Sequence, residues 1–349
     1  MKLASVHAAF LLVLLAAGGL MIWRSSSPTR ALRPPVTADG ARILLPDAAL
    51  LVTLDLEALG RSEWGKRALA ELPSTLAGSG VGRRCAAEQL ERVRSLALAV
   101  PTEEAGRGFE VGLVADGAFE AEETAACAAE LVTARGGEVA LSRLNDFDVV
   151  RDRRGGGELA IRDGGPLILS GGTFFRELVE RVAVLGERKR ASEEEDVRAR
   201  LHAALRARAG EAPLLATWVL APGWLERWLA EPQFAASPLA RIRTVVVRGE
   251  ADQRLRIRAE LSVEDDASAE QLRVFAGQLV RDFGLLTPPA HSDFQIVRDA
   301  RLVRISFSIA SADPSAWLAP LGAKSHPLGG ANSQELETER QSTAGGAAQ

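Results

Sequence analysis

Two nearly identical stretches lie 147 residues apart in this sequence. Residues 146–152 read DFDVVRD and residues 293–299 read DFQIVRD, with five of seven positions identical. Two further pairs keep almost the same offset: 93–100 (VRSLALAV) with 242–249 (IRTVVVRG), and 109–116 (FEVGLVAD) with 255–262 (LRIRAELS). A near-constant offset over three segments indicates duplication. The fold must therefore be one that two similar units can build.

The two copies share one order of expected elements, read from alternating and helical hydrophobic periodicity. In the first copy we expect strands at 50–57, 93–100, 109–116, 147–152, 158–162 and 167–170, and helices at 62–76 and 120–134. In the second we expect strands at 214–220, 242–249, 255–263, 294–299 and 302–310, a short helix after the first strand, and a helix at 268–283. Helices at 173–185 and 193–209 lie between the copies. The order β-α-β-β-α-β is that of the ferredoxin-like unit. The predicted fold class is α+β: tandem duplicated ferredoxin-like (βαββαβ) units with antiparallel sheets, after one N-terminal transmembrane helix.

An apolar N-terminal segment predicts export. Residues 3–23 contain no charge, and as a helix these 21 positions span about 30 Å, which matches a bilayer core. The strictly apolar part, 8–23, also has the length found in a cleavable signal peptide. We predict a single-pass anchor in the inner membrane of a bacterium with the body in the periplasm. Cleavage would instead release the body into the periplasm.

The domain organisation follows from changes in composition along the chain. We expect a signal anchor at 1–24, a spacer at 25–41, a first α+β repeat at 42–185, a helical connector at 186–210, a second α+β repeat at 211–320 and a disordered tail at 321–349.

The two cysteines, Cys85 and Cys127, form an even count in a chain expected to be exported, which favours a disulfide bond. The alternative is a pair of small buried thiols. Neither cysteine has the spacing of a zinc ligand or of a CxxC redox motif.

The sequence is poor in catalytic residue types. Of its four histidines only His202 and His291 fall in the expected body, and we expect both to be solvated. The common catalytic, nucleotide-binding and metal-binding motifs are absent. We therefore predict no catalytic residue, no cofactor and no metal. Residues 1–30 carry three basic residues and no acid, so the rest of this chain of net charge −4 has a charge of −7, which argues against nucleic acid as a partner.

Two segments are candidates for contact with a ligand or partner. Ser170, Gly171, Gly172 and Thr173 lie between a strand and a helix, where backbone N–H groups can hold an anion; the simpler interpretation is that Thr173 caps the helix. Trp224 and Trp228 share one helix face at i, i+4, which suits a contact with a partner protein or lipid, or core packing.

The outline resembles a group of membrane-anchored bacterial exported proteins of unknown function with tandem α+β repeats, in which a strand like 45–52 (LPDAALLV) opens each repeat. The second copy differs by opening with GEAP at 210–213. The resemblance spans most of 42–320 and implies an envelope location without an activity.

From the anchor, the spacer and the scarcity of catalytic residues, the sequence predicts a non-enzymatic envelope ectodomain that binds another protein or supports an assembly. The alternative is a carrier or sensor of an apolar ligand or lipid. The expected partners are an envelope protein or lipid, and the inner membrane through residues 3–23.

Overall fold

A computed structural model describes residues 44, 48–76, 85, 88–89, 91–101, 111–134, 136–183, 193–220, 237–283 and 291–309. All of them belong to one compact unit.

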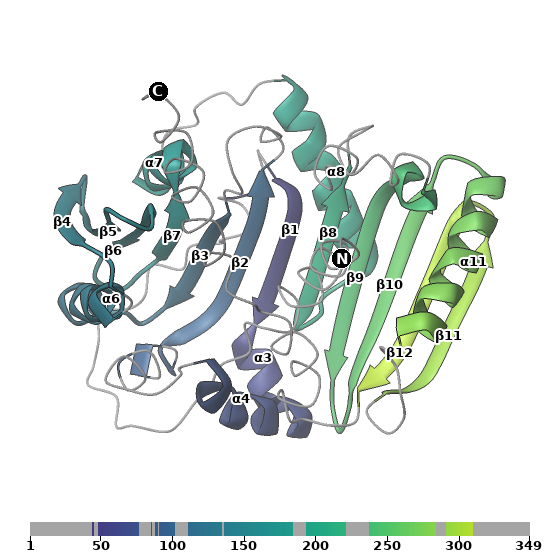
Figure 1. Ribbon diagram of the computed structural model, residues 1–349, viewed down its shortest axis with the longest axis horizontal. Helices are drawn as coiled ribbons and strands as arrows, with labels where there is room; N and C mark the ends of the chain where they lie inside the picture. Colours follow the sequence, from purple (N-terminus) through teal and green to yellow (C-terminus); the bar gives the residue numbers. More distant parts are fainter. Residues whose placement is uncertain are drawn as a thin grey trace, which may run out of the picture. The chain divides into compact units, whose positions relative to one another are not determined.

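The described strands form one antiparallel sheet of twelve (Figure 1). Its first six strands are β1 (Ala48–Asp55), β2 (Val93–Pro101), β3 (Gly112–Gly117), β4 (Val139–Leu144), β5 (Phe147–Asp152) and β6 (Gly157–Ile161). The other six are β7 (Leu167–Gly171), β8 (Leu214–Val219), β9 (Ile242–Ala251), β10 (Leu255–Val263), β11 (His291–Asp299) and β12 (Leu302–Ile309). Their order across the sheet is β11-β12-β10-β9-β8-β1-β2-β3-β7-β6-β5-β4. The expected α+β class with antiparallel strands is confirmed.

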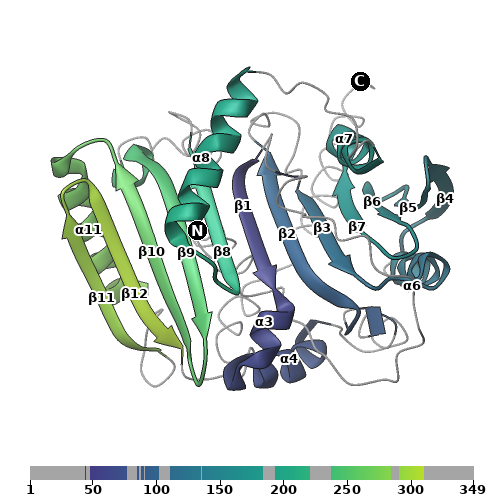
Figure 2. The ribbon, with the colours of Figure 1, turned by 180° about the vertical axis from the view of Figure 1, so that it is seen from behind.

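Within the described residues, six helices and one 3-10 turn accompany the sheet: α3 (Leu56–Arg61), α4 (Glu63–Leu76), α6 (Ala121–Ala134), α7 (Gly172–Ala183), α8 (Glu193–Ala209), α11 (Asp266–Phe283) and η2 (Pro238–Arg241). Helices α8 and α11 lie on opposite faces of the sheet, as the front and back views show (Figures 1 and 2). Helix α7 shares a core cluster with the face on which α8 packs, and we call this side the α7–α8 face.

The centre of the sheet is the antiparallel pair of β1 and β8, with Val52 opposite Ala216. Three successive residues of β1, Leu50, Leu51 and Val52, are 5%, 0% and 3% exposed. Because successive strand residues point to opposite faces, the sheet is covered on both sides at this point. This explains why the central strands are almost continuously apolar.

The two halves of the sheet extend in opposite directions from this centre. Strands β2 and β3 follow β1 on one side, and β9 and β10 follow β8 on the other. In each half the third strand leads to a helix, α6 or α11. The first half then ends in the four-stranded meander β4 to β7, whereas the second ends in the hairpin β11–β12.

The ferredoxin-like strand order predicted from the sequence is wrong for these strands. In a split βαβ unit the two strands that flank the helix are parallel and a third strand lies between them, but β1 and β2 are antiparallel neighbours here. The reason lies at the end of β1, where the Asp55 carboxylate accepts a hydrogen bond from the Ala58 N–H at 2.8 Å and caps α3. Helices α3 and α4 turn at the end of the sheet instead of crossing it (Figure 1), and the chain returns as β2 beside β1.

Several predicted segments lie outside the described residues: the anchor at 3–23, the spacer at 25–41 and the tail at 321–349. Among the described residues, no helix combines the length and the apolar character needed to cross a membrane. The predicted connector at 186–210 contains α8, which packs on β8, β9 and β1 and so belongs to the body.

Glycine allows α7 to approach the sheet closely. Phe174, Phe175 and Leu178 of this helix are at most 4% exposed, and burial of each such side chain contributes about 1.5 to 3 kcal/mol. A Cβ atom at Gly112, in β3, would lie 2.4 Å from Phe174 Cε1 and 2.8 Å from Leu178 Cδ1. Any larger residue at this position would push α7 away from the sheet.

We therefore predict that Gly112→Ala lowers the free energy of unfolding by about 1 to 3 kcal/mol through overpacking. The measurement is urea unfolding followed by tryptophan fluorescence. Gly157→Ala is the matched control, because a Cβ atom there meets nothing within 4 Å. Equal stability of the two variants would show that α7 is not held this closely.

Candidate interaction surface

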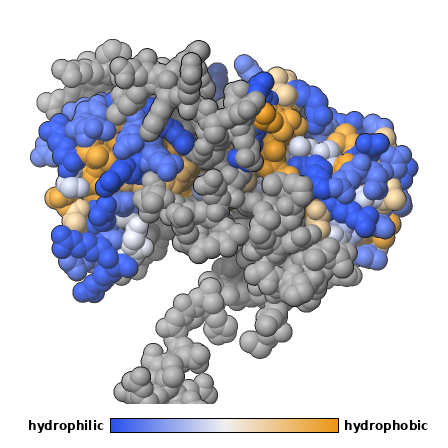
Figure 3. Space-filling view, turned by 90° about the horizontal axis from the view of Figure 1, so that it is seen from above, coloured by the Kyte–Doolittle hydropathy of each residue, from blue (hydrophilic) through white to orange (hydrophobic). Residues whose placement is uncertain are grey.

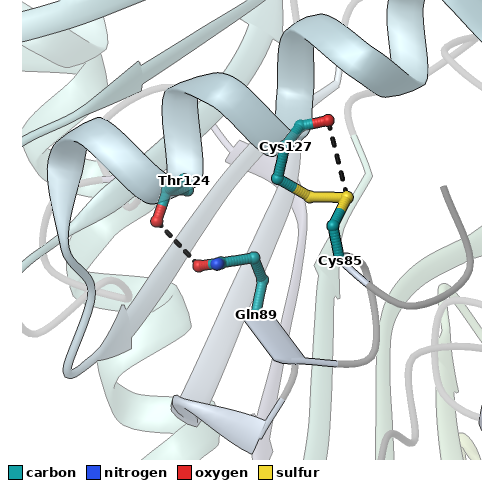
Figure 4. Close-up of a disulfide and its surroundings, with 4 residues drawn as sticks. All are labelled: Cys85, Gln89, Thr124 and Cys127. Atoms are coloured by element: carbon teal, nitrogen blue, oxygen red, sulfur yellow. Dashed lines mark hydrogen bonds between the residues drawn. A yellow bond between two sulfur atoms is a disulfide. The ribbon is translucent and has the colours of Figure 1, made fainter. Parts of the chain in front are cut away.

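A disulfide bond joins Cys85 to Cys127 of α6, with their Cα atoms 5.6 Å apart (Figure 4). This confirms the predicted pairing over the alternative of two free thiols. One turn before Cys127, the buried Thr124 hydroxyl donates a hydrogen bond to Gln89 Oε1 at 2.7 Å. The disulfide and this hydrogen bond together fasten the segment that precedes β2 to α6.

Removal of the disulfide should destabilise the fold by about 3 to 4 kcal/mol in the chain-entropy model, because the two cysteines are 42 residues apart. The measurement compares urea unfolding of the wild type with that of the double variant Cys85→Ala, Cys127→Ala. Thr124→Val, which removes only the neighbouring hydrogen bond, should cost about 1 kcal/mol. A double variant as stable as the wild type would contradict this role.

His202 of α8 is completely buried, so the prediction that it is solvated was wrong. Its Nε2 lies 2.9 Å from the Ala48 carbonyl oxygen and its Nδ1 lies 2.8 Å from Thr217 Oγ1. A carbonyl oxygen only accepts, so Nε2 carries the proton and Nδ1 of the neutral ring accepts from the Thr217 hydroxyl. Both ring nitrogens are thereby used within the fold, at the seam between β1 and β8.

Two arginines of α8 share the surroundings of His202. Burial lowers the pKa of His202 from 6.5 to about 4; the Ala48 carbonyl opposes this shift, and the positive charges of Arg198 and Arg206 add to it. Arg206 Nη1 also donates to Thr53 Oγ1 at 3.0 Å, which fastens α8 to β1 a second time.

The low pKa of His202 predicts a loss of stability in acid. Between pH 6.5 and about 4 the unfolded chain binds a proton at this residue and the folded chain does not, so unfolding becomes easier as the pH falls. The loss approaches roughly 3 kcal/mol near pH 4. His202→Gln should remove this part of the pH dependence of urea unfolding, and an unchanged pH profile in that variant would refute the assignment.

One row of residues runs across the α7–α8 face through directly opposed positions on ten strands. In the first half this row is almost entirely apolar and lies in the core cluster that α7 covers; in the second half it becomes polar. The row reads Val149, Ala160, Ile168, Val114, Ala97, Thr53, Leu215, Arg248, Arg258 and Ser306.

The polar half of this row belongs to a larger charged surface, which we call the arginine face. It comprises Arg208 of α8, Arg248 of β9, Arg256 and Arg258 of β10 and Arg304 of β12, together with Glu250, Glu260 and Asp299. The five arginines and three acids give a local charge of +2 on a chain whose net charge is −4. Seen from above, hydrophilic residues cover much of the end of the molecule that holds these strands (Figure 3).

Ion pairs hold the margins of the arginine face in place. Glu260 accepts from Arg208 at 3.4 Å and from Arg304 at 3.3 Å. Glu250 lies 2.6 Å from Arg248 and 4.0 Å from Arg256. Arg304 reaches Asp299 at 3.2 Å. Because these pairs are partly exposed, each contributes at most about 1 kcal/mol to stability. Their main effect is to orient the guanidinium groups.

Arg258, in the middle of the arginine face, lacks such compensation. Arg258 is exposed, is placed directly opposite Arg248, and makes no ion pair among the described residues. Arg248 donates to the Ala209 carbonyl through Nη1, but its Nε is buried and has no hydrogen-bond partner among them. Like charges directly opposite each other on neighbouring strands are destabilising. A carboxylate from outside would pair with the exposed Arg258 and relieve its repulsion with Arg248.

The candidate anion site at 170–173 has a different environment. Ser170 of β7 is buried, at 6% exposure. Helix α7 begins at Gly172, so Thr173 lies within the first turn of the helix and does not precede it. Glu158 of β6 is directly opposite Ser170 and is 5% exposed, paired with Arg151.

The other residues singled out in the sequence contribute little to this surface. Trp224 and Trp228 lie outside the described residues. His291 is the first residue of β11 and not part of a loop. Within the part of the chain that the structure describes, no group of three or more His, Cys, Asp or Glu side chains is placed to hold a metal ion.

Sequence reasoning missed the arginine face, although one signal was present. Arg254, Arg256 and Arg258 alternate with apolar residues in RLRIRAEL, and period-two spacing places Arg256 and Arg258 on one face of a strand. The sequence does not show that this face of β10 and β12 is left uncovered by the described helices.

Comparison with protein-family models, curated proteins and solved structures finds no match to this chain.

Proposed function

We propose that this chain is a non-enzymatic ectodomain of the bacterial cell envelope, held at the inner membrane by residues 3–23, and that it binds a partner protein through the arginine face. The disulfide between Cys85 and Cys127 supports an oxidising location such as the periplasm, since structural disulfides are rare in the cytosol.

The observation that carries the binding role is the contrast along one row of the sheet. In the first half, Val114 and Ile168 are buried beneath α7. In the second half, the same row continues into Arg258 of β10, which is exposed. An arginine-rich surface with an uncompensated centre is suited to an acidic protein, because guanidinium groups bind carboxylates in pairs of hydrogen bonds.

The arrangement of charges favours a protein over a membrane surface or an apolar ligand. Glu250, Glu260 and Asp299 are interspersed with the arginines, and a uniformly anionic bilayer would repel them. A partner protein can place acids opposite the arginines and bases or neutral groups opposite the glutamates. An apolar ligand would gain nothing from any of these charges.

The proposed function includes an evolutionary step. We infer that the two halves arose by duplication, on the evidence of the sequence repeat and of the shared order β1-β2-β3 and β8-β9-β10. The copies then diverged on the α7–α8 face: one kept an apolar surface for α7, and the other acquired the arginines.

The test uses fluorescently labelled poly-L-glutamate as a model acidic partner and the full chain in detergent micelles. We expect the double variant Arg256→Glu, Arg258→Glu to weaken binding about tenfold or more, because two contacts become repulsive. The matched control is Arg153→Glu, Arg154→Glu, which makes the same change of charge at exposed positions of the first half and should bind nearly as well as the wild type. Binding is measured by fluorescence anisotropy at low and high salt.

If both double variants lose the same affinity for poly-L-glutamate, the loss is a general effect of net charge, and the proposal of a specific binding surface is refuted. Binding of phosphatidylglycerol vesicles in place of poly-L-glutamate, with the same dependence on Arg258, would assign the arginine face to the membrane instead.

A further inference from the structure

The sheet has two ends, and they are built differently. Strands β4 and β11 are its outermost strands, and among the described residues neither pairs on its outer side. An edge strand exposes a row of unpaired N–H and C=O groups, which makes it a template for another strand unless the edge is disrupted or charged.

The β11 edge carries such a disruption. Its pairing with β12 shifts register between Ser292 and Gln295, and Asp293 within this bulge adopts a φ of 61°. The Asp293 carboxylate lies 3.7 Å from Arg254. A bulge that carries a charged residue disfavours the continuation of the hydrogen-bond ladder by a second strand.

The β4 edge carries no bulge. Its register with β5 is unbroken, from Val139 opposite Asp152 to Leu144 opposite Phe147. Leu141, in its middle, is 70% exposed, the highest value among the large apolar side chains of the described part. Arg143 is the one charged residue within this strand.

We propose that β4 pairs antiparallel with β4 of a second copy of this chain, across a two-fold axis at Leu141. Neighbouring residues on a strand point their backbone groups to opposite sides. Two antiparallel copies of one strand therefore align only with a residue opposite its own counterpart. With Leu141 at the axis, two exposed leucines cover each other, and Arg143 of each copy faces the uncharged Val139 of the other.

A second copy fits this edge better than an arbitrary extended segment, because the same short strand meets itself with no like charges directly opposed. The difference between the two edges also makes the assembly closed. Since β11 is protected, a copy has only one pairing edge, so association stops at a dimer and does not propagate into a fibre. The β4 dimer is independent of the arginine face, which lies on the other half of the sheet.

The experiment exploits the placement of Leu141 opposite itself. Leu141→Glu and Leu141→Arg, each alone, place like charges together at the axis and should lower the dimer association constant of the full chain in detergent about tenfold or more. An equimolar mixture of the two variants should restore dimers, because Glu then faces Arg. The measurement is sedimentation velocity, and Val297→Glu on the 50%-exposed position of β11, opposite Arg304, is the control that should dimerise like the wild type.

A wild type that stays monomeric at its highest soluble concentration would overturn the proposal, as would dimers that persist in both single variants. A mixture that remains monomeric would exclude pairing at Leu141. If either substitution impairs folding, hydrogen exchange of the wild type decides instead: the β4 amides should become more protected as concentration rises, and protection independent of concentration would refute the dimer.

Discussion

The antiparallel pairing of β1 with β8 is the interaction on which the rest of this structure depends. It merges the two halves of the chain into one sheet and buries both faces of the central strands. It also creates the seam at which α8 attaches, where His202 contacts the Ala48 carbonyl of β1 and Thr217 of β8 together. A single histidine thus fastens one helix to strands from both halves, and it must remain uncharged to do so.

Once the halves share a sheet, they differ in whether a helix covers the α7–α8 face, and this difference separates a buried core from an exposed surface. Helix α7 closes the α7–α8 face of the first half over an apolar core. In the second half, no described helix lies over β10 and β12 on that face, and Arg256 and Arg258 are exposed there. The stability of the first half and the proposed binding role of the second are therefore two outcomes of one architectural difference.

Local patterns predicted the elements well where the periodicity was strong. The range expected for β10 agrees with the structure, because apolar and polar residues alternate through LRIRAELSV, and the ranges expected for β5 and α8 agree as well. Strand β4 was not predicted: VALSRL at 139–144 has little alternation, and the strand forms because a two-residue turn at Asn145 folds it onto β5. His202 was expected in solvent because arginines surround it in sequence, yet it points to the seam while those arginines lie around it.

By itself, the sequence determined the repeat, most strands and helices and the α+β class, and it favoured the pairing of its two cysteines, because each follows from local spacing or from a count of residue types. Only the tertiary structure decided that β1 lies beside β2 and β8, that His202 is buried, and that the arginines of β9, β10 and β12 gather on one open face. Strand order and face covering arise from contacts between residues far apart in the chain. Periodicity shows which side of a strand is apolar, but it does not show which neighbour that side will meet.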